Sequence, residues 1–260
     1  GSNKIKEYVA RVKELGMDSA AITDHGVMFG CIDFYRAARE AGINPIMGCE
    51  VYVAPGSRFD KEQGNNSERY YHLVLLAENN TGYGNLMKIV SRGFTEGFYY
   101  KPRVDLDLLR KYHEGIIALS ACLAGEVSRN LVRGMYEEGK KAALRYLDIF
   151  GEGNFFLELQ DHGIPEQHMV NPQLLRMSRE TGIPLVATND VHYTYKEDVV
   201  PHDILLCLQT GKKIGDEDRM RYEGSQYFVK SPEEMEELFS YVPEALENKI
   251  GRAHVRTPVT

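Results

Sequence analysis

The chain repeats one pattern along its 260 residues: a short apolar run, a polar residue at one end of the run, and then a stretch with helical periodicity. The runs are rich in Val, Ile, Leu and Phe, and such short apolar runs are typical of buried parallel strands. They occupy residues 19–25, 45–53, 71–77, 115–122, 155–162 and 184–192. Strands that alternate with helices favour βαβ units, so the sequence predicts an α/β fold built on a parallel sheet or barrel.

The stretches between the runs carry signals that begin and end helices. Residues 7–15 place their apolar side chains on one face, and residues 32–41 and 172–181 are each followed by a glycine, the usual residue after a helix. Ser231 opens a capping box with proline at the first helical position. We therefore expect helices over these three ranges and another that begins after Ser231.

The composition is that of an ordinary globular protein, with 43% hydrophobic and 27% charged residues, and the net charge is −7. This charge argues against a protein that coats nucleic acid through a broad basic surface, but it leaves open a site where bound metal ions supply positive charge. No apolar run reaches the roughly 18 residues of a membrane span, and no signal peptide opens the chain. The four cysteines show no CxxC pairing, so we expect a cytoplasmic protein with no membrane partner.

Polar residues that can bind metals stand at the ends of the runs. In a parallel sheet or barrel the carboxyl ends of the strands meet at one rim, where the chemistry of such folds takes place. Imidazole, carboxylate and thiolate groups suit zinc, and the first two also suit manganese or iron. The candidates are Asp24, His25, Glu50, His72, Cys122, Asp190 and His192. His72 fits least well, because it begins its run rather than ending it.

Each of these residues is weak evidence by itself. A lone histidine in a loop is more often a surface or core residue than a ligand, and Cys122 alone would be interpreted as a small buried hydrophobe. Asp190 and His192 are a sharper signal, because residues i and i+2 of a strand point to one face. Together the candidates favour a pocket with several metal ions, which can activate water and neutralise phosphate during phosphodiester hydrolysis.

Several of these motifs resemble the PHP (polymerase and histidinol phosphatase) superfamily, namely residues 21–26 (AITDHG), 48–52 (GCEVY) and 187–193 (ATNDVHY). Further stretches resemble one branch of it, the alpha subunits of bacterial DNA polymerase III, namely residues 94–105, 119–126 and 219–224. The similarity runs over residues 2–249, and the motifs are long and specific. The chain is therefore identified as a member of that family.

The resemblance implies a distorted seven-stranded (βα) barrel of the TIM type, with two or three divalent ions, zinc or manganese, at its carboxyl rim. It implies the metal ligands His25, Glu50, His72, Cys122, Asp190 and His192. It also implies that Asp24, Asp190 and His192 carry the catalytic chemistry, with Asp24 as a ligand or the neighbour of one.

Members of the family begin with a strand that carries a His-x-His pair, and this sequence contains no such segment. We therefore expect a PHP domain over residues 1–249 that lacks this first strand and its two histidines and is inactive by itself. Residues 250–260 resemble a translated sequencing adapter and are expected to be a non-native tail without function.

The resemblance leaves two functions open. The first is metal-dependent phosphodiester hydrolysis, as 3′–5′ exonuclease proofreading beside the polymerase. The second is an inactive structural module that braces the polymerase and docks a separate proofreading exonuclease; ligand-capable residues at all the matching positions favour the first. A stand-alone histidinol-phosphate phosphatase is disfavoured by residues 93–98 and 219–228, which resemble the polymerase branch. The expected partners are primer–template DNA, the rest of the polymerase chain, an exonuclease subunit and other replisome subunits.

Other polar residues have weaker cases. Glu158 lies inside an apolar run and is expected to support the pocket, while Asp161-His162 ranks below the ligands. Tyr99 and Tyr100 could stack on bases, but packing is favoured. A phosphate contact, a solvated surface and a contact with the rest of the polymerase stay open for Arg92, Lys101 and Arg103. No context supports His113, His168, His202 and His254.

Overall fold

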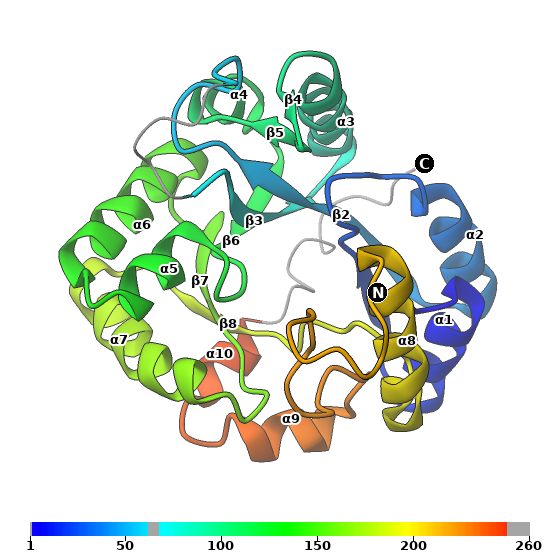
Figure 1. Cartoon of the computed structure of the whole chain (residues 1–260). Helices are drawn as coiled ribbons and strands as arrows, with labels where there is room; N and C mark the ends of the chain where they lie inside the picture. The colour runs from blue at the N-terminus through cyan, green and yellow to red at the C-terminus, as the bar shows by residue number, and fades with distance from the viewer. Residues whose placement is uncertain (1, 62–67, 249–260) are drawn as a thin grey trace.

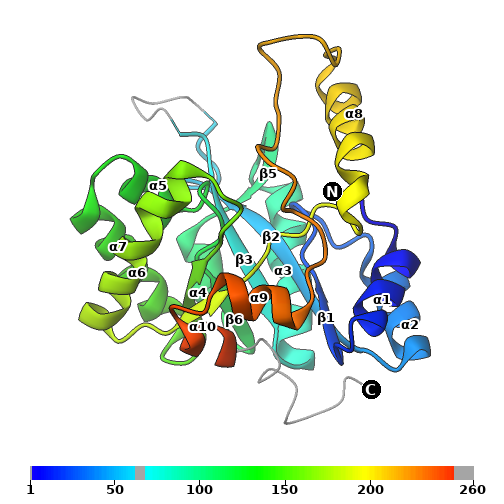
Figure 2. The same ribbon diagram turned by 90° about the horizontal axis from the view of Figure 1, so that it is seen from below.

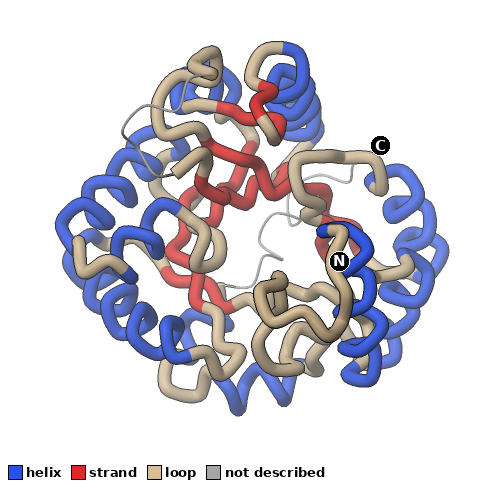
Figure 3. The backbone as a smooth tube through the Cα atoms, in the orientation of Figure 1, coloured by secondary structure: helices blue, strands red, loops and turns tan. Residues whose placement is uncertain are grey.

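The computed structural model describes residues 2–61 and 68–248. The predicted tail at 250–260, together with His254, lies outside the described residues. Within them, helices form a ring around a curled inner sheet (Figure 1). Figure 3 shows the same arrangement by secondary structure, with the strands as an inner arc. The predicted α/β class is confirmed.

The sheet has eight strands among the described residues, in the order β4-β5-β2-β3-β6-β7-β8, with β1 also paired to β2. The strands are β1 (Ser19–Ile22), β2 (Asn44–Val53), β3 (Tyr71–Ala77), β4 (Phe98–Tyr99), β5 (Lys101–Val104), β6 (Ile116–Leu119), β7 (Phe155–Leu159) and β8 (Leu185–Ala187). Strand β2 is long, and β1 pairs with its first half while β5 pairs with its last two residues. The end of β2 therefore brings the β4–β5 hairpin next to the loop that follows β1.

The sheet is mixed, so the expectation that all the runs form parallel strands is wrong for one of them. Strand β3 runs antiparallel to both of its neighbours, β2 and β6. Its first residues therefore lie at the rim where the parallel strands end, and His72 stands opposite Tyr52 in the register. The position of His72 at the start of its run, which fitted the parallel model least well, is explained by this reversal.

Ten α-helices and one short 3₁₀ helix are described. The helices are α1 (Ile5–Glu14), α2 (Cys31–Ala41), α3 (Asn80–Thr95), α4 (Leu106–Tyr112), α5 (Glu126–Val132), α6 (Tyr136–Phe150), α7 (Pro165–Thr181), α8 (Val199–Thr210), α9 (Pro232–Leu238) and α10 (Pro243–Glu247), with η1 (Lys196–Asp198) before α8. The four predicted helices are confirmed, including the capping box at Ser231 and the left-handed glycines after α2 and α7. Helix α7 begins earlier than predicted and contains Pro172 in its interior.

The two faces of the strands have different surroundings, because successive side chains of a strand point in opposite directions. Along β2, Cys49, Val51 and Val53 belong to the main apolar core with the surrounding helices. Glu50 lies between them in the sequence and borders an inner cavity of about 390 Å³. Apolar residues of the strands also line this cavity, among them Val74 and Leu76. The sheet thus encloses a space that polar side chains can share.

The sheet is open between β1 and β8, since no strand pairing joins these two within the described residues. The segment before α1 lies beside this opening: the Ser2 backbone N–H donates to His192 O at 2.6 Å, and Asn3 Nδ2 donates to Val191 O at 3.4 Å. Figure 2 shows α8 projecting from the body of the domain. No described helix is both long and apolar enough to cross a membrane.

Candidate metal centre

Three of the predicted ligands converge on one point at the rim of the sheet. His25 Nδ1 and His72 Nδ1 each lie 2.7 Å from the same oxygen, Glu50 Oε1. One potential ligand atom from each residue lies within 4.8 Å of the other two. Glu50 is buried, whereas the two imidazoles are partly accessible. This is a compact group of two nitrogens and one oxygen, a donor set that suits a divalent transition metal.

Backbone pairing beyond the strand ends holds this group in place. His25 forms an isolated parallel bridge with Glu50, and the Gly26 N–H donates to Glu50 O at 2.8 Å. Gly26 has a φ of +69°, and a Cβ there would lie 2.7 Å from the Tyr52 ring, so a glycine is required directly after His25. His72 in turn bridges to Gly125 in the loop that carries Cys122.

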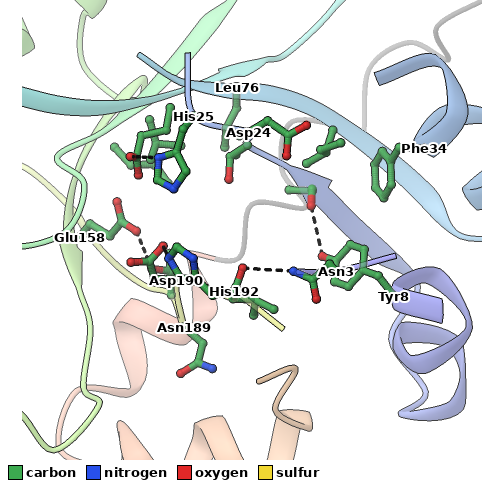
Figure 4. Close-up of a pocket in the computed structure, with 18 of the residues that line it drawn as sticks. Asn3, Tyr8, Asp24, His25, Phe34, Leu76, Glu158, Asn189, Asp190 and His192 are labelled. Atoms are coloured by element: carbon green, nitrogen blue, oxygen red, sulfur yellow. Dashed lines mark hydrogen bonds and ion pairs between the residues drawn. The ribbon is translucent and has the colours of Figure 1, made fainter. Parts of the chain in front are cut away.

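The other three predicted ligands lie next to this group. Cys122 Sγ is 3.7 Å from His72 Nδ1, and the His192 ring stacks on His25 with 5.8 Å between ring centres. His192 Nε2 lies 3.4 Å from Asp190 Oδ1. All the predicted ligands are therefore linked by contacts. Figure 4 shows Asp190 and His192 facing His25 across the cavity.

The reason given for Asp190 and His192 is wrong, although their proximity is observed. Strand β8 ends at Ala187, so neither residue lies on a strand, and Asp190 has a φ of +42°. Their side chains approach each other because the loop turns sharply at Asp190. The sequence predicted one strand over residues 184–192, but the strand pairing ends at Ala187.

Asp24 borders the cavity but stands apart from the compact group. Its carboxylate lies beside the start of α2, where a Cβ on Gly30 would be 3.1 Å from Asp24 Oδ2. Its backbone carbonyl accepts the N–H of Glu50 at 3.1 Å. Burial raises the pKa of the Asp24 carboxyl. The catalytic role expected for Asp24 therefore stays a prediction.

The charges of the compact group depend on one another. Burial by itself would raise the pKa of Glu50, but hydrogen bonds and charge interactions with His25 and His72 together hold it well below its usual range. The hydrogen bond to Glu50 raises the pKa of His25. Burial and the nearby carboxylates Asp190 and Glu50 raise the pKa of the Cys122 thiol well above its usual value. An ion that binds here therefore competes with protons on its ligands.

Binding of a divalent ion at this centre is expected to release protons and to weaken as the pH falls, because ligands must be deprotonated. His25 has a raised pKa, so a larger share of it is protonated near neutral pH and must lose its proton to bind the ion. Calorimetric titration with zinc at pH 8 and pH 6, in two buffers of different ionisation enthalpy, measures both effects. An affinity and a heat that are independent of pH and buffer would contradict the prediction.

Glu158 forms a second polar group inside the cavity. It is buried on β7, and its Oε1 accepts hydrogen bonds from Thr188 Oγ1 and Gln160 Nε2. Its Oε2 is buried without a partner among the described residues. Burial raises the pKa of Glu158 to about 7 against the hydrogen bonds, and the charge of Asp190 adds to the increase. The expectation that Glu158 supports the pocket agrees with this position (Figure 4).

The loop of Asp190 and His192 is held by a segment more than thirty residues later. Asn189 Nδ2 donates to Gln226 O at 3.0 Å and to Phe228 O at 2.7 Å, and Lys230 Nζ donates to Asn189 Oδ1 at 3.1 Å. The His192 N–H donates to Tyr227 O at 2.8 Å. The segment at 219–228, which the sequence connected only with a family branch, thus positions two of the predicted ligands.

Replacing Asn189 by leucine is expected to destabilise the fold by about 1–3 kcal/mol. It removes three hydrogen bonds, and the buried Phe228 carbonyl loses its partner, while the Lys230 ammonium and the Gln226 carbonyl keep the bond between them. Urea unfolding of both proteins measures the change. Gln173→Leu is the matched control, since the hydrogen bond that Gln173 donates goes to Met169 O in its own helix, at an exposed position. Equal losses in the two variants would show that the bonds of Asn189 contribute nothing special.

Two further residues near the centre were missed by the sequence interpretation. His202, which had no supporting context, is buried on α8 with its ring 5.6 Å from that of His192. Tyr222 lies 4.4 Å from His192, between ring centres. Neither position carries a local signal, because only the fold brings α8 and the loop after it to this rim.

The remaining candidates lie away from the compact group. His162 is buried, with its ring nitrogens next to Gln167 Nε2 and Asn189 O, and it stacks on Tyr227. It therefore supports the loop at 189 rather than reaching an ion. Asp161 pairs with the exposed His168 at 3.3 Å, and neither lines the cavity, while His113 is exposed.

The donor set is suited to a metal-dependent hydrolase. Buried Glu50 joins two imidazoles, a thiol lies next to one imidazole, and a second carboxylate–imidazole pair faces the other. Residues of these types from separate loops around one cavity fit the ligands of one or more divalent ions. Such ions bound close together stabilise the attacking and leaving oxygens of a phosphoester.

Comparison with known proteins agrees with this geometry. A PHP domain model matches residues 1–162. The DNA polymerase III subunit alpha of Borreliella burgdorferi is 46% identical over 250 residues, which cover 96% of this chain and 22% of the relative. The same subunit of Treponema pallidum is 45% identical over 261 residues, which cover 99% of this chain and 22% of that relative. The chain thus spans about a fifth of the length of these curated relatives.

Among solved structures, an amidohydrolase from Chromobacterium violaceum matches with a TM-score of 0.47 and 14% identity, over 74% of this chain and 84% of that one. A likeness this low adds nothing to the assignment. The relatives extend the match past residue 162, so it includes the loop of Asp190 and His192. The chain belongs to the PHP domain family, in the branch of the DNA polymerase III alpha subunits.

Proposed function

We propose that this domain is a metal-dependent phosphodiesterase within a full-length replicative polymerase subunit, where it removes nucleotides from a 3′ end as a proofreading exonuclease. The observation that carries the proposal is the convergence of His25 and His72 on one oxygen of Glu50, with Cys122, Asp190 and His192 in contact around it. A module that only braces the polymerase has no need of this donor set.

Two or three divalent ions, zinc or manganese, are proposed at this centre. His25, Glu50 and His72 would hold one, and Cys122, Asp190 and His192 would complete the coordination of the others. The donors are too many for a single tetrahedral ion. Such ions, when bound, supply an activated water and neutralise the charge of the phosphate.

The chain's own residues have distinct tasks in this proposal. Glu50 orients His25 and His72 through its Oε1, and Asp190 orients His192 from 3.4 Å. Glu158 retains a proton over part of the neutral pH range, since its pKa is about 7, and so limits the negative charge inside the cavity. Asp24, whose carboxylate lies beside the start of α2, would also contribute to the catalytic chemistry.

The test uses the full-length subunit, freed of metal by a chelator and dialysed. Manganese or zinc is expected to restore removal of nucleotides from the 3′ end of a single-stranded oligonucleotide, and elemental analysis is expected to find more than one bound ion per chain. Less than one tightly bound ion, or a removal rate unaffected by chelation, would overturn the proposal.

One observation favours the alternative, an interaction module that docks another protein. Helix α8 carries Val200, Ile204 and Leu208 at successive turns of one face, and these residues are 59%, 44% and 73% exposed. The two roles can be separated in the full-length subunit by Leu208→Asp. Loss of a bound exonuclease subunit with intact metal-dependent hydrolysis would assign docking to α8 and leave catalysis to the metal centre.

The proposed partners follow from the same family. They are primer–template DNA, the rest of the polymerase chain, and, for the docking role, a proofreading exonuclease or other replisome subunits. All of them meet in the cytoplasm, where we propose that the protein acts.

A further inference from the structure

The corner of the β4–β5 hairpin presents an exposed aromatic ring. Tyr100 stands between β4 and β5, where Tyr99 pairs with Lys101, and it is 62% exposed. Its φ of +61° lies in the left-handed region, which is uncommon for a residue other than glycine. Strained residues of this kind persist where the surrounding structure holds them, and they cluster at functional sites. The hairpin thus holds a large aromatic side chain in solvent at a position that favours glycine.

One cation lies over this ring, and the cation of the next residue in the chain lies over a second tyrosine. The guanidinium carbon of Arg69 lies 4.3 Å from the centre of the Tyr100 ring, and Lys101 Nζ lies 5.5 Å from the centre of the Tyr52 ring. Neither cation takes part in a salt bridge with any of the described residues. Arg69, Tyr100 and Lys101 together are called the Tyr100 corner below.

The other arginines of this region are engaged within the protein. Arg58 binds Glu96 and Asp105, and Arg92 binds Glu96. Arg103 is buried, and its guanidinium donates to the carbonyls of Gly97 and Asp60. Of the cations whose role stayed open in the sequence, Arg92 and Arg103 are therefore structural, while the charge of Lys101 is available to an external anion.

The Tyr100 corner borders the metal centre. The Tyr52 ring, which Lys101 approaches, lies 5.4 Å from the His72 ring, and the Tyr70 ring is parallel to that of His72 at 6.1 Å. On the other side, a Cβ on Gly26 would be 3.0 Å from Pro102 Cγ in β5, so the hairpin also touches the loop of His25. The Tyr52 ring thus lies between the partly exposed Lys101 ammonium and the predicted ligand His72.

We propose that the Tyr100 corner binds single-stranded DNA and leads its 3′ end to the metal centre. An exposed aromatic ring can stack on a base of a single strand, because that base is not stacked inside a duplex. The Arg69 guanidinium over the ring and the Lys101 ammonium of the next residue would attract the neighbouring phosphates. The chain as a whole has a net charge of −7 and would repel DNA. Two cations without a salt-bridge partner among the described residues therefore provide a local positive charge that can attract it. The proposal rests on the proposed nuclease function, because it supplies the substrate to that site.

The experiment measures binding of a short fluorescent oligothymidylate to this 260-residue chain, with a chelator present so that no hydrolysis occurs. Tyr100→Gly is expected to weaken binding about ten-fold through loss of stacking. Glycine suits the positive φ, so the melting temperature should stay unchanged or rise. Tyr100→Trp retains an aromatic face and is expected to restore binding.

Arg69→Ala and Lys101→Ala test the charge separately. Each is expected to reduce the slope of the logarithm of affinity against the logarithm of salt concentration by about 0.7, the value for one phosphate contact on a single strand. Tyr100→Gly should leave this slope unchanged. Tyr241→Ala and Lys13→Ala are matched controls, because these residues are also exposed but lie on other parts of the domain.

The outcomes separate this proposal from the nuclease function. Selective loss of oligothymidylate binding in the corner variants would support the Tyr100 corner even if the full-length subunit hydrolyses nothing. Equal binding by the corner and control variants, equally tight binding of duplex DNA, or no binding by the parent chain would overturn it, whatever the hydrolysis rate.

Discussion

Asp190→Asn or His192→Ala in the full-length subunit is expected to lower the metal-dependent removal of 3′ nucleotides on the order of 100-fold or more, while polymerisation stays measurable. Both residues face His25 across the cavity, and each would lose a metal ligand. Changes around a metal site cost 10–100-fold in affinity or activity even where the ligands themselves remain. The polymerase reaction would use a separate site. A variant that still polymerises is therefore folded, and its loss of 3′ nucleotide removal can be assigned to the metal centre.

The chain offers a matched control for this pair. Asp161 and His168 form a similar contact, 3.3 Å against 3.4 Å, but neither is among the residues that line the cavity. Asp161→Asn and His168→Ala are expected to leave the rate unchanged. The rates are measured on a labelled single strand with saturating manganese, and again on a matched primer terminus with nucleotides. An unchanged exonuclease rate in the Asp190 and His192 variants would place these residues outside the active site.

Glu158→Gln is expected to remove a pH dependence of about 3 kcal/mol from the stability of the metal-free chain. In the folded protein, burial holds this carboxyl at a pKa of about 7, against the usual value of 4.5 for a glutamate. A raised pKa means that the folded state binds the proton more tightly than the unfolded state. The associated stability is fully present below pH 4.5 and is lost as the pH rises through about 7.

Urea unfolding at pH 5 and pH 8.5, with a chelator present, measures this difference. The parent chain should lose more stability between the two conditions than the Glu158 variant, and the two should differ most at pH 8.5. Glu152→Gln, an exposed glutamate, controls for the loss of one negative charge. The same pH dependence in parent and Glu158 variant would show that this carboxyl is not held in its protonated form.

Some features of the metal centre could be predicted from the sequence, and others could not. The residue types and the runs that carry them were evident from the sequence, because ligand chemistry is a property of single side chains. His25 and Cys122 follow their strands as predicted, whereas Glu50 lies inside β2, three residues before its end. The direction of β3 was not evident, because an apolar run has the same composition whichever way it points. Only its pairing with β2 and β6 places His72 at the shared rim.

The loop of Asp190 and His192 shows the same limit in another form. The sequence located both residues, but it predicted a strand where the chain turns at Asp190. The turn is held by Asn189 and the backbone of residues 226–228, which are distant in the chain. Local preferences extend over a few residues, so they cannot reveal a loop that is shaped by such bonds.

What the sequence determined by itself was local: the ends of helices at glycines and at Ser231, the apolar runs, and the kinds of atom available to bind metal. These depend on backbone preferences and side-chain chemistry within a few residues. The tertiary structure decided which cations are buried and which are free, as with Arg103 and Lys101 on one short strand. It also decided that His202 lies next to His192 and that His25 and His72 share one oxygen of Glu50. Burial and distance depend on contacts between segments far apart in the chain, so no local pattern reveals them.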